Sequence, residues 1–449
     1  MLRKAHVLMS ITSIFATYNN SISNMVKYII SLVISLLIGG SSIAQSEFVK
    51  TSKSGNFILN DRTYYYAGTN FWYGPILGSK GRGGNRARLN KELDALHALG
   101  LNNLRIAIGA DGNNDVLTRI KPTLQTEPGV YNDTILDGLD YLLVQMKKRK
   151  MKAVLYLNNA WEWTGGYSQY LAWVKHETPP VPAKDGWPAY MSYVKQYVFN
   201  DSAKALFNKH VVFILNRTNR YSKVKYVDDP TIMSWQISNE PRCFSEEGKK
   251  PFKIWLRSVS SLIKSIDKNH LVTTGSEGSW GCENDMQLFI DIHADPNIDY
   301  LTMHLWPYNW SWVNKTTLQS NLKLAEKNTK KYVEEHILVA RQLHKPVVME
   351  EYGYPRDGFS FSKQSSTSAR DEYYKFVYDM LITSKKQRDN FAGCNFWGWG
   401  GLAQPRHTFW QWGDDYCGDP AQEEQGLNSV FSSDKSTLNI IRDASKRLN

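Results

Sequence analysis

Two glutamates, Glu240 and Glu351, each follow a short apolar segment of the chain and directly precede a turn. Pro241 follows the first, and a Tyr-Gly pair at 352–353 follows the second. Two carboxylates around a small cavity can share acid/base and nucleophilic work if one is protonated and the other ionised. Burial raises the pKa of the acid, whereas a nearby cation keeps its partner ionised. The pattern therefore predicts a catalytic pair, if the fold brings the two residues together.

Polar residues at the ends of other apolar segments supply the partners that such a pair needs. Arg105 is the expected cation, and Asn239 and His304 are expected to bind substrate or the nucleophile. An isolated glutamate more often forms an ion pair or caps a helix, but this combination favours catalysis. Side chains alternate along a strand, so we expect Glu351 to face the site and its neighbour Glu350 to point to the opposite face.

Aromatic residues are abundant, with 15 Trp, 25 Tyr and 17 Phe among 449 residues, and many lie beside polar residues. Their faces suit the stacking of sugar rings. Trp72, Trp306 and Trp397 are the tryptophans expected to bind substrate, whereas Trp235 is expected to be core. Further sugar platforms are expected among Trp161, Trp163, Trp310, Trp312 and Trp399. Carboxylates beside such platforms are suited to cleaving a glycosidic bond.

Short β-branched segments alternate with longer amphipathic ones along the chain. The expected strands are 64–71, 102–109, 152–159, 232–240, 271–278, 300–306, 346–353 and 392–399. The expected helices are 88–100, 135–150, 187–200, 252–267, 317–343 and 370–385, and the connection after the fifth strand is expected to be irregular.

Alternating strands and helices require a parallel sheet, because parallel strands need crossover connections. Eight such units predict an α/β fold, a (β/α)₈ TIM barrel, whose strands all point their C-terminal ends toward one mouth. A doubly wound open sheet is the alternative, but no G-x-G-x-x-G or Walker loop follows any strand. No linker or repeat divides residues 45–449, so we expect a single catalytic domain.

The N-terminal segment has the pattern of an export signal. Residues 1–44 lack Asp and Glu, and Lys27 precedes an apolar run that is too short to span a bilayer. We therefore expect a signal peptide at 1–44, with 1–24 as a possible upstream mis-start, and a secreted or periplasmic protein without a membrane anchor after cleavage. An uncleaved anchor is the weaker alternative.

Charge and cysteine content indicate which partners, metal ions and disulfides to expect. The net charge is +11, but the basic residues are dispersed, so no nucleic-acid partner is expected. No H-E-x-x-H or Cys/His cluster indicates a metal, and no cofactor is expected. Export permits disulfides, with Cys243–Cys282 the first expectation and Cys394–Cys417 the second.

Five segments together resemble the endo-β-1,4-mannanases of glycoside hydrolase family 5, in the group with fungal and plant enzymes. They are DDPTIMSWQISNEPRC, MHLWPYNW, PVVMEEYGYPRDG, CNFWGWGG and GDPAQEEQGLNSVFSSDKST, which begin at residues 228, 303, 346, 394 and 418. The Asn-Glu-Pro motif alone is moderately specific, whereas the combination is strong. The likeness covers nearly the whole chain after residue 45.

The resemblance implies a role for each matching residue. Glu240 would be the general acid/base and Glu351 the nucleophile, with Arg105 supporting the latter. Asn239 would bind the hydroxyl on C2, His304 would be the family's active-site histidine, and Trp397 the floor beneath the sugar before the scissile bond. Where a Tyr commonly follows the histidine by two residues, this chain has Trp306. The resemblance therefore does not supply the hydrogen bond that the tyrosine would make to the nucleophile.

The function implied is a secreted, retaining endo-β-1,4-mannanase acting on mannan, galactomannan or glucomannan. We expect it to be a monomer. A β-1,4-glucanase on the same scaffold is one alternative, because the two substrates differ mainly at C2. A non-catalytic carbohydrate-binding protein is the other, although binding alone does not need both glutamates and Arg105.

Overall fold

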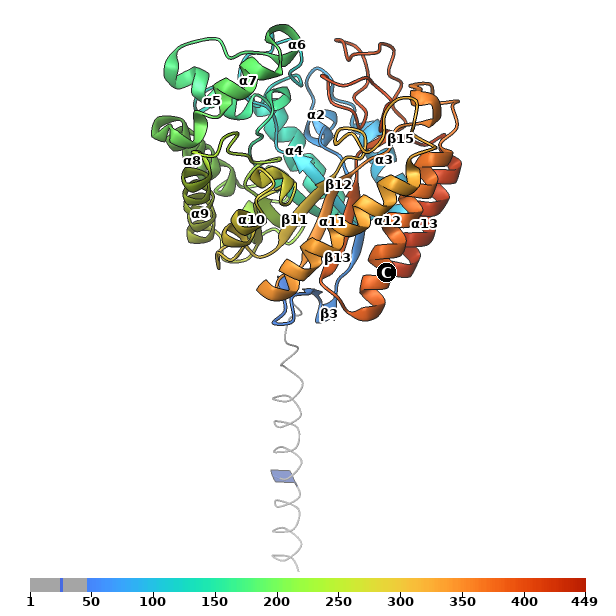
Figure 1. The fold of residues 1–449 in the computed structure, drawn as a ribbon. Helices are drawn as coiled ribbons and strands as arrows, with labels where there is room; N and C mark the ends of the chain where they lie inside the picture. Colours follow the sequence, from blue (N-terminus) through green and yellow to red (C-terminus); the bar gives the residue numbers. More distant parts are fainter. Residues whose placement is uncertain (1–24, 27–46) are drawn as a thin grey trace, which may run out of the picture. The chain divides into compact units, whose positions relative to one another are not determined.

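The computed structural model describes residues 25–26 and 47–449. The expected signal peptide therefore lies almost wholly outside the described residues. Residues 47–449 form one compact unit (Figure 1). Its centre is an eight-stranded parallel sheet in the order β10, β9, β8, β5, β4, β13, β12 and β11. All eight expected strands are present.

The strands of this sheet are short and almost completely buried. They are β4 (Tyr66–Asn70), β5 (Asn103–Ala107), β8 (Lys152–Tyr156), β9 (Ile232–Gln236), β10 (Leu271–Thr273), β11 (Leu301–Leu305), β12 (Val347–Tyr352) and β13 (Phe391–Phe396). Backbone bonds join the two outer strands of this order: Asp299 donates to the Val272 carbonyl at 2.8 Å, and His304 to the Glu277 carbonyl at 3.2 Å. The sheet therefore nearly closes on itself, and the protein has the predicted TIM-barrel fold.

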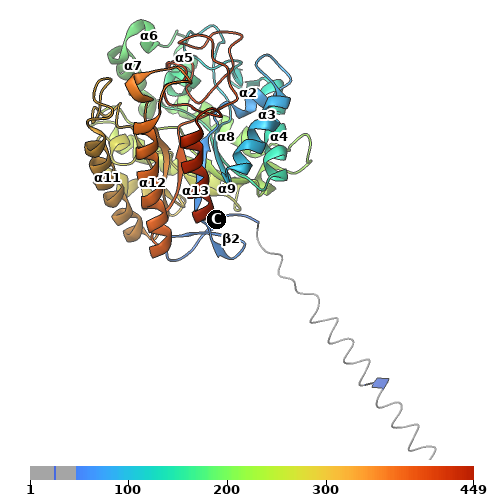
Figure 2. The same cartoon turned by 90° about the vertical axis from the view of Figure 1, so that its right-hand side faces the viewer.

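Helices surround the sheet (Figures 1 and 2). They are α2 (Gly74–Gly78), α3 (Arg86–Ala98), α4 (Asp133–Lys148), α5 (Gly166–Lys175), α6 (Pro182–Asp185), α7 (Trp187–Val194), α8 (Asp201–Leu215), α9 (Lys249–Ile266), α10 (Met286–His293), α11 (Leu322–Leu343), α12 (Ser368–Gln387) and α13 (Lys435–Leu448). In α9, for example, Phe252, Leu256, Val259 and Ile263 recur every three or four residues and are buried. This spacing forms the apolar stripe by which a helix packs on a core.

Two of the connections between strands differ from the expectation. The segment 187–200 contains α7 and then the 3₁₀ turn Tyr197–Phe199, after which Asn200 caps α8 by accepting from the Ala203 amide. The fifth strand is followed by the 3₁₀ turn Trp280–Cys282 and by α10, which Asp285 caps. That connection therefore does contain a helix. In both places a capping side chain starts a new helix, as such residues do.

Smaller elements lie at the two ends of the barrel. The antiparallel strands β1 (Lys50–Thr51), β2 (Phe57–Leu59) and β3 (Arg62–Thr63) lie at the lower end in Figure 1. β14 (Trp399–Gly401) pairs with β15 (Val430–Phe431), which lies in the upper part of Figure 1. β6 (Gln125–Glu127) pairs with β7 (Val130–Tyr131). We call residues 402–429, between β14 and β15, the strap.

The expected disulfides are not formed. All four cysteines lie in the described part of the chain, and all are buried and free. Cys394 contacts the Tyr352 hydroxyl, whereas Cys417 contacts Asp419 and Gln425. Within residues 25–26 and 47–449, no helix is long and apolar enough to cross a membrane.

Candidate active site

The two predicted carboxylates meet at the barrel mouth. Glu240 follows β9, Glu351 lies in β12, and His304 lies in β11. One side-chain oxygen of each glutamate and one ring nitrogen of the histidine all lie within 4.8 Å of one another. Glu240 has a φ of 47°, which non-glycine residues seldom adopt. Strain of this kind is found where a side chain must be aimed at a functional site.

Glu351 is held by an arginine and a tryptophan. Arg105 Nη1 donates to its Oε1 at 2.5 Å, and Trp306 Nε1 donates to its Oε2 at 3.2 Å. The indole of Trp306 therefore donates a hydrogen bond to Glu351 from the position where the family commonly has a tyrosine.

Arg105 is completely buried and links several residues of the site. Its Nη2 donates to Asn239 Oδ1 at 2.7 Å, its Nη1 also donates to Asn70 Oδ1 at 3.0 Å, and its Nε donates to Gln236 Oε1 at 2.9 Å. These bonds fix the guanidinium plane, so the cation cannot turn away from Glu351. Asn239 is fixed in addition because its Nδ2 donates to Asn159 Oδ1 at 3.1 Å.

Glu240 has different partners. Trp161 Nε1 donates to its Oε2, and His304 Nδ1 lies 2.8 Å from its Oε1. Burial lowers the pKa of His304 well below its ordinary value, and Arg105 lowers it further, so the imidazole is neutral. A neutral imidazole can donate from Nδ1 to an ionised carboxylate, or accept there from a protonated one in its other tautomer. His304 therefore suits a partner that changes protonation state.

Burial raises the pKa of both glutamates. For Glu240, the charges of Arg242 and Arg105 and the Trp161 hydrogen bond oppose this rise. For Glu351, the neighbouring Glu240 raises the pKa further, whereas Arg105 opposes it. Because two close carboxylates resist being ionised together, they titrate as a pair that holds one proton over part of the pH range. Direct contact with Arg105 favours the ionised form at Glu351.

Glu350 does not point to the opposite face, as strict alternation predicted. The pairing of β11 with β12 shifts so that Met303 faces Met349 and His304 faces Glu351, which leaves Glu350 as an extra residue. Such a bulge interrupts alternation. The Glu350 carboxylate lies 3.6 Å from Arg105 Nε, is completely buried, and has its pKa raised by burial to about 7.

Both glutamates line a cavity of about 830 Å³. Its aromatic lining includes five of the expected tryptophans, Trp161, Trp163, Trp306, Trp310 and Trp397, together with Trp187 and Trp280. Trp187 and Trp280 lie in the connections after the third and fifth strands, and sequence reasoning missed them. Asn239 also lines the cavity, whereas Arg105 and His304 lie buried behind it.

Trp72 does not line the cavity, contrary to expectation. It is 1% exposed, and its Nε1 donates to the Gly418 carbonyl at 2.8 Å. Its ring packs edge-on against Trp163. The strap covers Trp72 and separates it from the cavity. Trp72 therefore supports the cavity wall from behind, through its contact with Trp163. Trp312 and Trp399 are also absent from the lining, and Trp399 Nε1 instead donates to Glu92.

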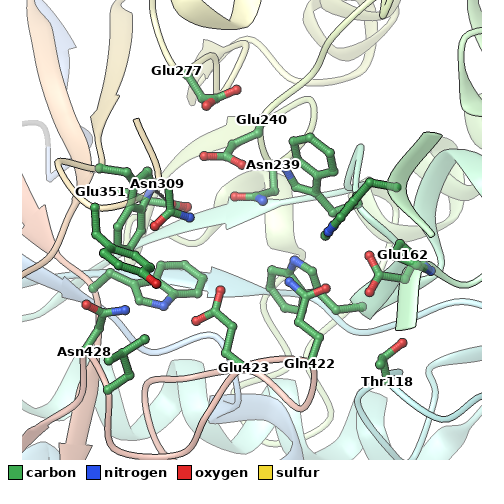
Figure 3. A pocket seen from close by; sticks show the side chains of 18 of the residues that line it. Thr118, Glu162, Asn239, Glu240, Glu277, Asn309, Glu351, Gln422, Glu423 and Asn428 are labelled. Carbon is green, nitrogen blue, oxygen red and sulfur yellow. Dashed lines mark hydrogen bonds between the residues drawn. The ribbon is translucent and has the colours of Figure 1, made fainter. Parts of the chain in front are cut away.

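The strap closes one side of the mouth. The Lys121 backbone amide donates to the Tyr416 hydroxyl at 2.7 Å. The Gln422 side chain lies against the Glu162 carboxylate, to which its nitrogen donates at 3.1 Å once the amide is turned over. Figure 3 shows Gln422 and Glu423 pointing into the cavity, across from Glu240. Burial raises the pKa of Glu423 well above its ordinary value, and its Oε2 has no hydrogen-bond partner among the described residues. Sequence analysis identified residues 418–437, which include these two side chains, only as a segment that resembles the family.

A metal ion is poorly suited to this site. The Glu240, His304 and Glu351 atoms are close enough to share one. However, Arg105 already places a fixed positive charge against Glu351. A second cation at the same carboxylate would be repelled by the guanidinium.

A TIM barrel with paired glutamates and tryptophan platforms at its mouth defines the protein as a glycoside hydrolase. Residues 46–449 match the family model described as GH family 5 beta-mannosidase-like, and the chain belongs to this family. The family and the fold thus agree with the resemblance found in the sequence.

Individual relatives resemble most of the chain. Mannan endo-1,4-beta-mannosidase 7 of Arabidopsis thaliana is 29% identical over 92% of this chain and 88% of its own length. A variant of the family 5 mannosidase from Rhizomucor miehei, solved with mannosyl-fructose, is 33% identical with a TM-score of 0.83, covering 90% of this chain and 98% of its own. The endo-1,4-beta-mannanase of the same organism is 25% identical with a TM-score of 0.63, covering 89% and 99%.

Proposed function

We propose that the protein hydrolyses β-1,4-mannosidic bonds with retention of anomeric configuration and cuts internal bonds of β-mannans. The names of the relatives support mannose-containing substrates over glucans. We propose further that the enzyme is exported, as residues 1–44 predict, and that it acts as a monomer without a cofactor.

The mechanism follows from the different surroundings of the two glutamates. Ionised Glu351 attacks the anomeric carbon while Glu240 protonates the departing oxygen, which yields a glycosyl-enzyme and a free sugar end. Glu240 then takes a proton from water, the resulting hydroxide attacks the anomeric carbon, and Glu351 leaves as a carboxylate. Asn239 binds the hydroxyl on C2 during both steps, and the bond from Arg105 that fixes its side chain supports this role.

The separation of the carboxylates carries this proposal. Oxygens of Glu240 and Glu351 lie within 4.8 Å. Retaining enzymes hold the two carboxyl groups about 5–5.5 Å apart, whereas inverting enzymes leave about 6.5–9.5 Å for a water. The separation seen here is shorter than the inverting range and close to the retaining one.

Proton NMR of the first products tests the mechanism. We expect the β anomer at each new reducing end to appear before mutarotation produces the α anomer. An α anomer as the first product would overturn retention.

Carboxymethylcellulose assayed in parallel should stay uncut, and faster cleavage of that polymer than of mannan would favour the glucanase alternative.

The strap favours a second candidate, the removal of single mannose units from a chain end. Its residues 422–428 form part of the cavity wall, where Gln422 lies against Glu162. A walled cavity accommodates a chain end more readily than an uninterrupted polymer. Product sizes decide between the two modes: internal cleavage releases oligosaccharides and rapidly lowers the viscosity of galactomannan, whereas terminal cleavage releases mannose with little change in viscosity.

Trp306→Phe tests the hydrogen bond to the proposed nucleophile. Loss of the Nε1 donor removes a bond to an ionised group, so we expect kcat to fall about tenfold. The bond favours the charged form, so its loss raises the pKa of Glu351 and shifts the acidic limb of the kcat/KM profile to higher pH. Trp310→Phe is the matched control, because Trp310 lines the same cavity without bonding to Glu351. Identical pH profiles for both variants would contradict the role of Trp306.

A further inference from the structure

A second cavity lies on the outer side of the strap. It has a volume of about 260 Å³. Its lining comes from two separate segments, 73–88 and 410–416, and includes Arg82, Asn85, Arg88, Trp410, Trp412 and Asp415. The strap thus contributes residues 422–428 to the first cavity and residues 410–416 to the second.

The aromatic residues of this cavity form a rigid corner. The rings of Trp410 and Trp412 meet at 61° with centroids 5.3 Å apart. Trp410 stacks on Tyr416 at 4.4 Å, and the Tyr416 hydroxyl is fixed by the Lys121 backbone. Trp412 is 38% exposed, so part of its ring faces solvent although Trp410 packs against it. A fixed ring that faces solvent can stack on a sugar at a small cost in side-chain entropy.

Several hydrogen-bond donors at this cavity are unused. The Arg82 guanidinium lies 3.8 Å from the Trp412 ring centroid. Within the described residues, neither this guanidinium nor Trp412 Nε1 has a hydrogen-bond partner. Asn85 uses its Oδ1 to cap α3, so its Nδ2 is also available. These donors suit the hydroxyl oxygens of a sugar.

The charges of the cavity are balanced. Arg88 pairs with Glu92 at 2.9 Å and with Asp415 at 3.3 Å, and Asp414 pairs with His407 at 2.9 Å. Of the charged residues that line this cavity, only Arg82 has no ion pair with a described residue, and it lies against Trp412. The cavity therefore lacks the cluster of free cations that recognition of a phosphate or sulfate requires. A neutral, hydroxyl-rich ligand fits this balance better than an anion.

We infer that this cavity is a secondary carbohydrate site that holds a mannosyl unit of the polysaccharide substrate away from the active site. The choice of mannan rests on the proposed function, whereas the choice of a neutral sugar rests on the cavity itself. A polymer that contacts both cavities would gain affinity through avidity, and a short oligosaccharide would not.

Trp412→Ala is the decisive variant, with Phe409→Ala as its control. Phe409 is a more exposed aromatic residue of the strap, at 52%, but does not line the cavity. Both changes are made in a Glu351→Ala background so that polymer is not consumed during binding. We expect Trp412→Ala to weaken binding to insoluble mannan about three- to tenfold, the value of one aromatic stacking contact, and Phe409→Ala to leave it unchanged.

Kinetics with Glu351 intact provide the second readout. Trp412→Ala should raise KM for galactomannan and leave kcat/KM for mannotetraose at the wild-type value. Equal mannan binding by Trp412→Ala and Phe409→Ala would overturn the inference while leaving the proposed function intact. Absence of mannan hydrolysis, together with Trp412-dependent binding of xylan or cellulose, would overturn the mannan substrate and support a carbohydrate site at this cavity.

Discussion

Glu351→Ala is expected to lower kcat on mannan by on the order of 10⁵-fold, because no other group can form the glycosyl-enzyme. The alanine side chain leaves space beside Arg105 and Trp306, the two donors to the missing carboxylate. Added azide should enter this space and attack an activated mannoside from the side that Glu351 normally uses. The product should be the α-mannosyl azide, identified by NMR.

A pocket glutamate outside the proposed pair provides the control for this experiment. Glu424 lines the same cavity from the strap. Glu424→Gln should keep kcat within a few-fold of the wild type and should yield no azide product. Full activity of Glu351→Ala, or an azide product of β configuration, would remove Glu351 from the nucleophile's role.

Glu240→Gln is expected to separate the two chemical steps. Loss of a general acid costs about 10²–10⁴-fold on a natural substrate, whose leaving group must be protonated. A dinitrophenyl mannoside needs no such help, so its first step should proceed near the wild-type rate and the glycosyl-enzyme should accumulate as a burst. Azide should then restore turnover and give the β-mannosyl azide. Equal losses on mannan and on the activated substrate would contradict the assignment.

The pH profile provides an independent check on Glu240. Burial raises its pKa above the ordinary value. The first step requires protonated Glu240. Activity should therefore be present below the pKa of Glu240 and be lost as the pH rises through that pKa. This basic limb should disappear from the Glu240→Gln profile measured with the activated substrate. A basic limb that persists there would show that another group titrates.

The positions of the chemical groups could be predicted from sequence because a parallel barrel is regular. All strands of the barrel end at the same mouth, so predicting the strands also predicts which residues lie there. These residues are Glu240, Glu351, Arg105, Asn239 and His304. In the structure Arg105 bonds to Glu351 and Asn239, and His304 bonds to Glu240. His304 Nδ1 also lies 3.4 Å from Glu351 Oε2, so all five residues are brought together. This result needed no knowledge of the connections between strands.

Predictions that depended on strict local rules were less successful. Alternation placed Glu350 on the opposite face, but a register shift between β11 and β12 turned it toward Arg105. Trp72 was expected at the sugar because it follows a strand, but the strap covers it. Neither the shift nor the cover can be read from the segment itself, since both arise from contacts with residues far away in the sequence.

The sequence by itself determined the fold class, the carboxylate pair and the cation beside it, because strand periodicity and residue type act locally. The tertiary structure alone decided that Trp306 bonds to Glu351, that Trp187 and Trp280 join the cavity, and that the strap walls it and forms a second cavity outside. These features depend on how long connections fold over the barrel mouth. Their course is set by many weak packing contacts between distant residues, which no short sequence pattern encodes.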